Sequence, residues 1–268
     1  MSYMHVLTDV MPAVRRARQA VLEIYREERP DVQYKSDQSP VTAADRAAHR
    51  ILVDALRALT PDWPVVSEEG LCPAERLEAH RIWLVDPLDG TRDFLGKTGD
   101  FSINVALVED GRAVAGLVDV PVSGATYLAE LGRPVTKLVS GQEPLLLSRP
   151  RVRWSDPMVL AVSRNHRQSE TEWAAQRGIT VSKWIPAGAA LKFCYLAEGR
   201  VDLYVRLGPT MEWDTAAGQV LVEAMGGTLR GVDGAPMRYN KVDLLNPAFY
   251  AVGPLAGEAP DWARETAR

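Results

Sequence analysis

The chain has 268 residues, of which 46% are hydrophobic, and its 31 Lys and Arg residues against 35 Asp and Glu residues give a formal net charge of −4. A chain of this length and composition buries a substantial core as one large domain or two fused lobes, so it does not need disulfides to fold. Because the opposite charges are interspersed along the chain, the composition argues against a dedicated nucleic-acid-binding protein.

The first half of the sequence opens with two helical patterns and continues with strands. Apolar residues recur at helical spacing from Leu7 to Tyr25, and a second helical pattern follows Thr42 and stops at Pro61. Short apolar, β-branched runs predict strands at 64–67, 81–85, 102–108 and 113–120, the last two joined by a hairpin turn at 109–112.

From about residue 148 the pattern alternates between strands and helices, as in α/β proteins. Strands are predicted at 159–162, 180–184 and 203–205, and helices at 168–177, 189–197 and 215–225. The Arg- and Pro-rich stretch Pro144–Pro157 is a candidate linker. We therefore expect an α+β lobe over residues 1–150 that carries most of the chemistry and an α/β lobe over residues 151–268.

The N-terminus and the two cysteines bear on the cellular compartment. Residues 1–18 carry charges throughout and lack the apolar core and cleavage site of an export signal, and no stretch approaches the ~20 apolar residues of a membrane-spanning helix. Cys72 and Cys194 stand far apart without a C-x-x-C partner, which favours buried, reduced thiols. We expect a cytoplasmic enzyme or binding protein, and the sequence leaves open whether it forms a homodimer or attaches loosely to the inner face of the membrane.

Acidic residues follow the predicted strand at 81–85 directly, in the order Asp86-Pro87-Leu88-Asp89-Gly90-Thr91. Magnesium prefers oxygen ligands, so two carboxylates on either side of a proline-stiffened turn, with the main-chain carbonyl of Leu88, predict a magnesium site. The N–H groups of Gly90 and Thr91 would then face a phosphate if Thr91 opens a helical turn. The same residue types also favour an ordinary turn, and this motif alone does not decide between the two interpretations.

Two further segments place acids at the ends of predicted elements. Ser67-Glu68-Glu69-Gly70 follows the strand at 64–67, and Trp213-Asp214 comes just before a helix that ends at Gly226-Gly227. Each acidic pair is compatible with solvated charge, and the glycine pair is typical of a tight helix-to-strand turn. Three element ends that all terminate in acids indicate a shared cation, because converging carboxylates repel one another without one. Trp213 is expected to pack in the core.

The order of these motifs resembles the signature of the lithium-sensitive, magnesium-dependent phosphatase superfamily, which includes inositol monophosphatases and fructose bisphosphatases. The resemblance runs from Lys35 to Pro247 and rests on the acidic motif at 86–91, on Trp213-Asp214 and on the spacing to Gly226-Gly227. It implies a layered αβαβα sandwich with the active site between two lobes.

Four segments resemble one branch of that superfamily, the bacterial 3'(2'),5'-bisphosphate nucleotidases of sulfate assimilation. They are 35–45, 163–166, 191–194 and 206–210. This resemblance implies that the chain hydrolyses 3'-phosphoadenosine 5'-phosphate to AMP and phosphate, so that its partner is a small phosphorylated nucleotide.

The resemblance also implies a role for each acidic residue. It makes the side chains of Glu68, Asp86, Asp89 and Asp214 and the carbonyl of Leu88 the ligands of two or three Mg²⁺ ions. Such ions lower the pKa of water, which then attacks phosphorus without a covalent phosphoenzyme.

Glu68 and the hydroxyl of Thr91 are the candidates for orienting that water, and Asp45, which the resemblance places near a looser metal, joins them as a catalytic residue. The N–H groups of Gly90 and Thr91, with Asp89 and Asp214, are expected to hold the phosphate.

For the nucleotide, the resemblance points to His166, Lys192 and Arg206, of which the two cations would meet the second phosphate. The alternative interpretations are a solvated surface charge for each cation and a loop-capping role for His166.

One departure concerns the substrate. The nucleotidase branch has Gly-Ser-Ser where this chain has Gly188-Ala189-Ala190, so a hydroxyl expected to face the nucleotide is missing. An inositol or sugar phosphate monoesterase with the same metal site therefore stays an alternative, as does a catalytically silent sensing module. Intact Glu68, Asp86, Asp89, Thr91 and Asp214 argue against the silent module.

Overall fold

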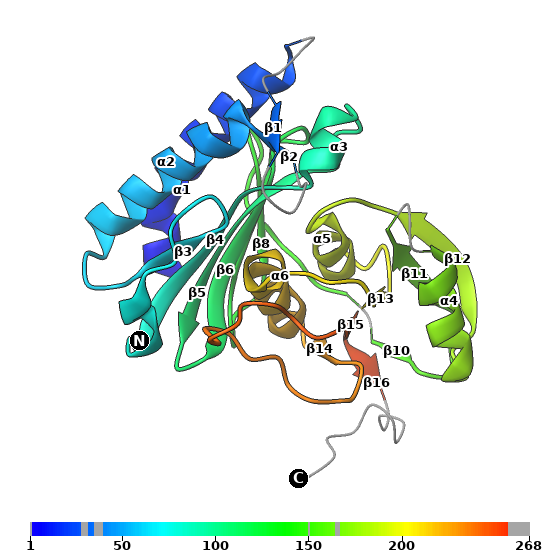
Figure 1. Ribbon diagram of the computed structural model, residues 1–268. Coiled ribbons are helices and arrows are strands. Elements are labelled where there is room, and N and C mark those ends of the chain that lie inside the picture. The colour runs from blue at the N-terminus through cyan, green and yellow to red at the C-terminus, as the bar shows by residue number, and fades with distance from the viewer. Residues whose placement is uncertain (1, 28–31, 35–39, 150, 164–166, 257–268) are drawn as a thin grey trace.

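The structure is a computed structural model that describes residues 2–27, 32–34, 40–149, 151–163 and 167–256. Within these residues, layers of helix, sheet, helix, sheet and helix follow one another (Figure 1). Three clusters of buried apolar side chains lie between the layers and hold them together. This is the layered αβαβα sandwich expected from the sequence. No helix in the described ranges has the length and apolarity to span a membrane.

The outer helical layer and the first sheet come from the first half of the chain. Helices α1 (Met4–Tyr25) and α2 (Ala43–Leu59) cover one face of a seven-stranded sheet. In order across the sheet, its strands are β3 (Val65–Ser67), β4 (Arg81–Asp89), β5 (Ser102–Glu109), β6 (Arg112–Val120), β7 (Ala125–Glu130), β8 (Thr136–Val139) and β9 (Leu145–Leu146). Only the β3–β4 pair of this sheet is parallel.

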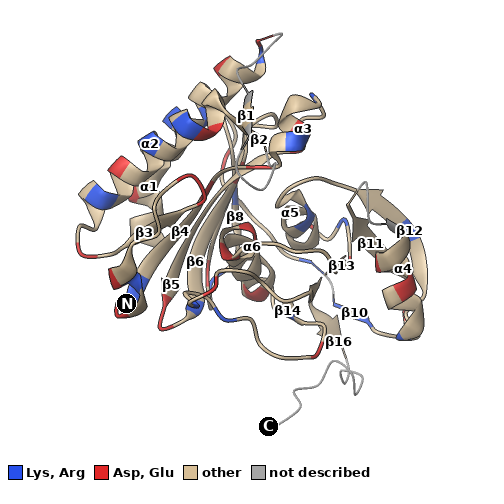
Figure 2. Cartoon of the chain, in the orientation of Figure 1, with Lys and Arg blue, Asp and Glu red and all other residues tan. Residues whose placement is uncertain are grey.

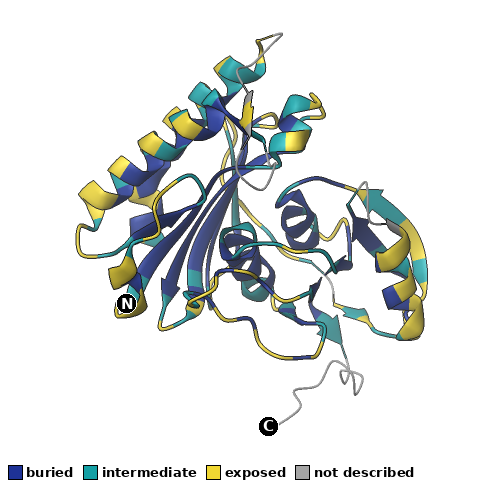
Figure 3. Ribbon diagram, viewed as in Figure 1, coloured by how far each residue is buried: buried dark blue, intermediate teal, exposed yellow. Residues whose placement is uncertain are grey.

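Both faces of this sheet are buried because its strands alternate between two apolar clusters. In β4, Trp83 and Val85 pack beneath α1 and α2, whereas Ile82 and Leu84 face the central helices. Figure 3 shows the result, with buried strands inside and exposed residues along the outer helices. In Figure 2, basic and acidic residues alternate along the outward faces of α1 and α2, as the interspersed charges of the sequence predict.

The second sheet has five strands and comes from the second half of the chain. In order across the sheet, these are β12 (Val181–Pro186), β11 (Met158–Val162), β13 (Leu203–Arg206), β15 (Phe249–Val252) and β14 (Thr228–Gly231). Helix α4 (Arg167–Gln176) packs on its outer face. Helices α5 (Leu191–Ala197) and α6 (Glu212–Ala224) lie between the two sheets.

Short elements complete the fold in the described residues. They are the antiparallel pair β1 (Val32–Tyr34) and β2 (Pro40–Thr42), the parallel pair β10 (Val152–Arg153) and β16 (Leu255–Ala256), helix α3 (Thr91–Leu95) and a 3₁₀ helix over Ala74–Leu77. The candidate linker at 144–157 therefore contains β9 and β10, each paired with a different part of the molecule.

Helix α6 belongs to the second half of the chain but packs on the sheet of the first. A Cβ added to Gly116 of β6 would lie 2.9 Å from Ala217 Cα, and one added to Gly218 would lie 2.1 Å from the Phe193 ring. Small residues thus let α6 approach both β6 and α5 closely. The lobe boundary near residue 150 stays a prediction, because α6 follows that boundary in the sequence but packs on the sheet that precedes it.

Three local expectations are wrong. Residues Asp86 to Asp89 form no turn but continue β4 with a shift of register. Helix α6 begins at Glu212, so Asp214 lies in its first turn rather than before it. Cys194 is buried as expected, but Cys72 is exposed and its Sγ accepts a hydrogen bond from Arg76 Nε at 2.8 Å, because the loop after β3 lies on the surface.

Candidate active site

Three acidic side chains from two distant segments meet in the structure. One carboxylate oxygen from each of Asp86, Asp89 and Asp214 lies within 4.8 Å of the other two. Asp86 and Asp89 end β4, and Asp214 lies in the first turn of α6. Glu68, directly after β3, lines the same cavity as Asp89 and Asp214, and its charge raises the pKa of Asp86. The predicted convergence of acids is confirmed, while their role as metal ligands stays a prediction.

A bulge in β4 is what puts Asp86 and Asp89 on one side. Asp86 pairs with Asn104 of β5 and Asp89 pairs with Ser102, so three steps on β4 oppose two on β5. In a regular strand, residues three apart point to opposite faces, and the extra residue returns them to the same face. The backbone N–H of Leu88 donates to Asp86 Oδ1 at 3.0 Å, and Asn104 Nδ2 donates to Asp89 Oδ2 at 3.2 Å.

Burial makes this cluster of acids hard to ionise. It raises the pKa of Asp86 and of Asp214 well above the usual value, and the neighbouring carboxylates add to the rise. Burial also raises the pKa of Asp89 to about 6, although the Lys192 ammonium and the Asn104 hydrogen bond act in the opposite direction. Such a group of oxygen donors gains from a cation that neutralises it.

Thr91 connects the acidic cluster to Asp45. Its Oγ1 lies 3.2 Å from Asp45 Oδ1 and 3.3 Å from the Leu88 carbonyl oxygen. Asp45, in the first turn of α2, is itself held by the N–H and hydroxyl of Thr42, at 2.7 and 2.6 Å, and burial raises its pKa. Gly90 precedes Thr91 with φ +90°, and a Cβ there would lie 3.0 Å from the Asp100 carbonyl oxygen. Thr91 opens α3, which is the condition under which the N–H groups of Gly90 and Thr91 were expected to face a phosphate.

Three of the acids, Glu68, Asp89 and Asp214, line a cavity of about 570 Å³. This volume is in the range of small-molecule sites. Besides Glu68, Asp89, Thr91 and Asp214, the cavity is lined by Gly188, Ala189, Lys192, Tyr204, Arg206 and Phe249. The structure therefore brings the predicted phosphate-binding and nucleotide-binding residues to one place, except for His166, which lies outside the described residues.

Lys192 is not the solvated surface charge that was one interpretation of it. The side chain is buried on α5, and Nζ donates to the carbonyl oxygens of Ala187 and Ala189 at 3.2 and 2.8 Å. It also lies 5.1 Å from the centre of the Tyr204 ring. Burial lowers its pKa, and the Asp89 carboxylate opposes that change. The ammonium is thus fixed at the cavity wall.

Arg206 ends β13 at the same cavity. Its Nη2 donates to the Pro209 carbonyl oxygen at 3.3 Å, and its Nε is buried without a hydrogen-bond partner among the described residues. Its charge lowers the pKa of Asp214. The guanidinium therefore faces the acids while part of its hydrogen-bonding capacity is unused.

Sequence reasoning missed Asn104 and Tyr204. Asn104 is the one strongly polar side chain inside the apolar run at 103–108, and a buried amide in a strand was a signal that could have marked it. Tyr204 gave no such signal, because an aromatic residue in a predicted strand is most often part of the core. Trp213, by contrast, packs against the central apolar cluster as predicted.

Comparison with known proteins places this geometry in a family. The family model described as "Inositol monophosphatase family" matches residues 4–261. The chain is 40% identical over 249 residues to the 3'(2'),5'-bisphosphate nucleotidase CysQ of Escherichia coli strain K12, covering 91% of this chain and 98% of the relative. It is 35% identical to the protein of the same name from Aggregatibacter actinomycetemcomitans, covering 91% of each chain.

Solved structures agree with the sequence comparisons. CysQ from Bacteroides thetaiotaomicron, described as a bacterial member of the inositol monophosphatase family, has a TM-score of 0.81 at 34% identity and covers 98% of this chain and 99% of its own. An inositol monophosphatase from Zymomonas mobilis has a TM-score of 0.76 at 25% identity, covering 95% and 94%. The chain belongs to the inositol monophosphatase family.

Proposed function

We propose that this chain is a magnesium-dependent 3'(2'),5'-bisphosphate nucleotidase, which hydrolyses 3'-phosphoadenosine 5'-phosphate to AMP and phosphate. The observation that carries the proposal is one cavity in which half-buried acids face two cationic side chains, Lys192 and Arg206. Relatives named for this activity match over 91% of the chain.

The donor set fits magnesium. The carboxylates of Glu68, Asp86, Asp89 and Asp214, with the Leu88 carbonyl, are all oxygen donors, and three of these carboxylates lie close enough to share ions. Burial raises the pKa of Asp86, Asp89 and Asp214, and a cation bound between these carboxylates would offset that rise. When bound, the ions would neutralise phosphate oxygens and lower the pKa of water.

The chain's own residues orient the reactants. Glu68 accepts a hydrogen bond from the attacking water, and the Thr91 hydroxyl, held between Asp45 and the Leu88 carbonyl, fixes that water on the side of phosphorus opposite the leaving oxygen. The N–H groups of Gly90 and Thr91 donate to phosphate oxygens. As the water oxygen bonds to phosphorus, the water transfers a proton to the Glu68 carboxylate. The bond from phosphorus to the ribose oxygen breaks, and that oxygen takes up a proton from solvent, which leaves AMP and phosphate.

The second phosphate of the substrate gives the cations a role. The Arg206 guanidinium binds phosphate oxygens in a forked geometry, and the Lys192 ammonium acts as a nearby point charge. Tyr204 and Phe249 add apolar surface to the cavity that a nucleoside would occupy. His166 remains part of the proposal from the sequence.

A sugar or inositol monoesterase is the second candidate, and Ala189 favours it. The Ala189 side chain lines the cavity where the nucleotidase branch carries a hydroxyl. Losing one hydrogen bond there is worth about 0.5–1.5 kcal/mol, which changes substrate preference more readily than reaction class.

A substrate panel tests the proposal. Phosphate release from the adenosine bisphosphate, inositol 1-phosphate and fructose 1,6-bisphosphate is measured with Mg²⁺, with EDTA and with millimolar Li⁺. We expect the adenosine bisphosphate to have the highest kcat/KM, no turnover in EDTA and inhibition by Li⁺. A preference for inositol 1-phosphate would assign the second candidate, and metal-independent turnover would contradict both.

A further inference from the structure

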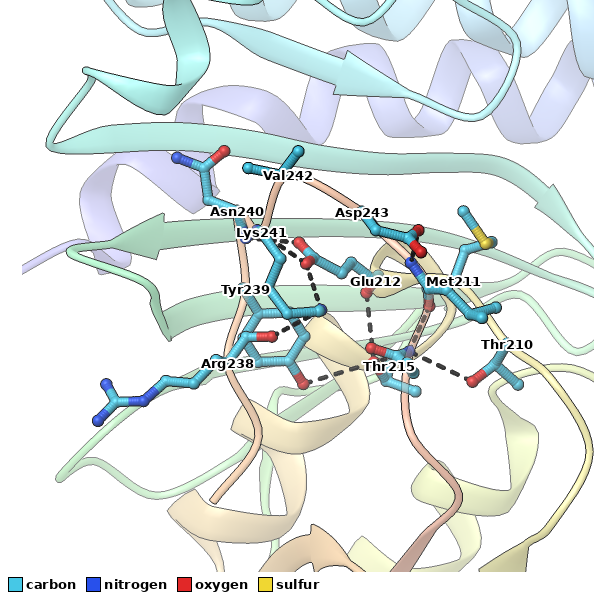
Figure 4. A network of polar contacts seen from close by, with 12 residues as sticks. Thr210, Met211, Glu212, Thr215, Arg238, Tyr239, Asn240, Lys241, Val242 and Asp243 are labelled. Atoms are coloured by element: carbon cyan, nitrogen blue, oxygen red, sulfur yellow. Dashed lines mark hydrogen bonds and ion pairs between the residues drawn. The ribbon is translucent and has the colours of Figure 1, made fainter. Parts of the chain in front are cut away.

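Residues 238–246, between β14 and β15, form a segment that contacts two parts of the active-site scaffold. On one side, the Asn246 amide donates to the Met211 carbonyl oxygen at 2.6 Å and to Thr215 Oγ1 at 3.0 Å. The backbone N–H of Glu212 donates to the Leu244 carbonyl oxygen at 2.9 Å. Figure 4 shows this segment lying against the first turn of α6.

Glu212 is the strongest anchor between the segment and α6. Its side chain is fully buried. Oε2 accepts the backbone N–H of Asn240 at 2.5 Å, and Oε1 accepts the backbone N–H and the Nζ of Lys241 at 3.0 and 2.5 Å (Figure 4). A buried carboxylate that accepts two backbone N–H groups and one ammonium is held in a single geometry.

The Arg76 guanidinium also binds this segment, at residues 240–242. Arg76 belongs to the loop that follows Glu68, and its side chain is buried. Nη1 donates to Asn240 Oδ1 and to the Lys241 carbonyl oxygen, both at 2.8 Å, and Nη2 donates to the Val242 carbonyl oxygen at 3.1 Å. The Asn240 amide returns a hydrogen bond to the Arg76 carbonyl oxygen at 2.6 Å.

The two anchors therefore hold residues 240–242 between the start of α6 and the segment that follows Glu68. Glu212 lies two residues before Asp214 on α6, whose Oδ2 accepts the Met211 N–H at 2.7 Å. Arg76 lies on the loop that begins at Glu68. Since like charges repel one another, a scaffold has to keep these acids at binding distance when no cation is between them.

We propose that Glu212 and Arg76 are positioning residues that fix Asp214 relative to the Glu68 loop through residues 240–242, and so pre-form the metal site. Neither side chain is among the residues that line the cavity, so they act through the acids and not on substrate. This inference rests on the proposed metal-dependent function.

The test measures metal binding without turnover. Mn²⁺ binding to the metal-free protein is followed by the electron paramagnetic resonance signal of free Mn²⁺, with Mg²⁺ as competitor. Glu212→Gln keeps the shape of the side chain, but its amide N–H groups would face the N–H donors of Asn240 or Lys241. In Arg76→Lys, one ammonium cannot reach Asn240 Oδ1 and the carbonyl oxygens of Lys241 and Val242 together. We expect each to weaken Mn²⁺ binding by about 10-fold or more, as for other residues that orient metal ligands.

The double variant distinguishes a shared spacer from two separate supports. If both anchors act through residues 240–242, losing the second adds little once the first is lost, so the effects on Mn²⁺ affinity are non-additive. The Mg²⁺ concentration for half-maximal activity should rise in parallel, with kcat largely recovered at saturating Mg²⁺.

Asp202→Asn is the matched control. It removes the buried ion pair between Asp202 and Arg149, at 2.8 Å, which lies at the end of β13 away from Arg206. We expect a lower Tm with unchanged Mn²⁺ affinity.

Folded Glu212→Gln and Arg76→Lys proteins with wild-type Mn²⁺ affinity would overturn the inference. If one of them does not fold, the other decides by the same criterion. A wild-type protein that binds no Mn²⁺ or Mg²⁺ would instead overturn the proposed function.

Discussion

The pKa of the Asp89 carboxylate is set by opposing effects. Burial and the charge of Glu68 raise its pKa, whereas the Lys192 ammonium and the Asn104 amide lower it, and the result is a value of about 6. Asp214 has fewer compensating partners, and its pKa lies well above the usual range. The acids of the site thus depend on counter-charge to different degrees, and Asp214 depends on it more than Asp89 does.

Replacing Asp214 with Asn should remove activity. Asn keeps an oxygen that accepts the Met211 N–H, so the helix start is preserved while the negative charge is lost. We expect kcat/KM for the adenosine bisphosphate to fall more than ~100-fold, since even residues that only orient metal ligands are worth about 10- to 100-fold. The exposed Asp110→Asn, which alters only the contact with His80, is the control. Near-normal turnover of the Asp214 variant would show that the ligand assignment is wrong.

Ala189→Ser should shift substrate preference toward the adenosine bisphosphate. Ala189 has φ +48° and lines the cavity, and Ser meets the same backbone geometry while adding a hydroxyl there. One hydrogen bond of about 0.5–1.5 kcal/mol corresponds to a gain of roughly 2- to 10-fold in relative kcat/KM over inositol 1-phosphate. The buried Ala190→Ser serves as the comparison. An unchanged ratio for Ala189→Ser would mean that this position does not face the nucleotide.

Among the elements, β4 and α6 set the geometry of the site. The bulge in β4 turns Asp86 and Asp89 to the same side, and α6 delivers Asp214 from more than a hundred residues away. The helix reaches that place because its small residues approach both β6 and α5. The position of the acids therefore depends on a bulge in β4 and on small residues in α6.

Gly218→Ala should destabilise the protein through α6. The new methyl group would lie 2.1 Å from the Phe193 ring, and overpacking of this kind costs about 1–3 kcal/mol. We expect urea unfolding to show a lower midpoint. Gly208→Ala, whose Cβ would make ordinary contacts at 3.6 Å or more, should change the midpoint little. Equal stability of the two variants would mean that α6 and α5 shift apart easily.

At the scale of the whole molecule, the site lies between the two sheets and collects groups from both halves of the chain. The first sheet supplies Asp86 and Asp89, and the second supplies Arg206. Metal binding should therefore stabilise the assembled fold, because ligands so far apart in sequence are not gathered in the unfolded chain.

The stability of the metal-free protein should depend on pH, and the raised pKa of Asp89 gives the direction of that dependence. Asp89 has a folded pKa of about 6 against 3.8 when unperturbed, so between these values the folded state binds more protons than the unfolded state. The free energy of unfolding of the metal-free protein then falls as pH rises through this window, and Asp86 and Asp214 extend the effect to higher pH.

Mg²⁺ binds the deprotonated acids, so the increase in Tm on adding Mg²⁺ should be larger at pH 8 than at pH 5.5. Differential scanning fluorimetry with and without Mg²⁺ at both values measures it. The Asp214→Asn variant should lose most of the difference. An equal increase at both pH values would contradict the raised pKa values of these acids.

Helices α1, α2, α4, α5 and α6 and strands β3 to β6 and β11 to β13 were predicted from the sequence, as were the acids at their ends, whereas β7, β8, β14 and β15 were not. The family resemblance also came from the sequence. These features depend on local periodicity and on short motifs, which neighbouring residues carry by themselves. The cluster of Asp86, Asp89 and Asp214 was predicted as a group, because like charges at several element ends indicate a shared cation.

Only the tertiary structure decided how those parts meet. The bulge follows from the register of β4 against β5, and the burial of Lys192 follows from the packing of α5. The hydrogen bonds of Glu212 and Arg76 to residues 240–242 follow from long-range contacts, such as that of Arg76 with Asn240, which lies 164 residues away. The residues of a single segment do not determine its register against a neighbouring strand or the burial of its side chains, since both depend on long-range packing. The sequence therefore determined the chemical groups, and the fold determined their distances and their degree of burial.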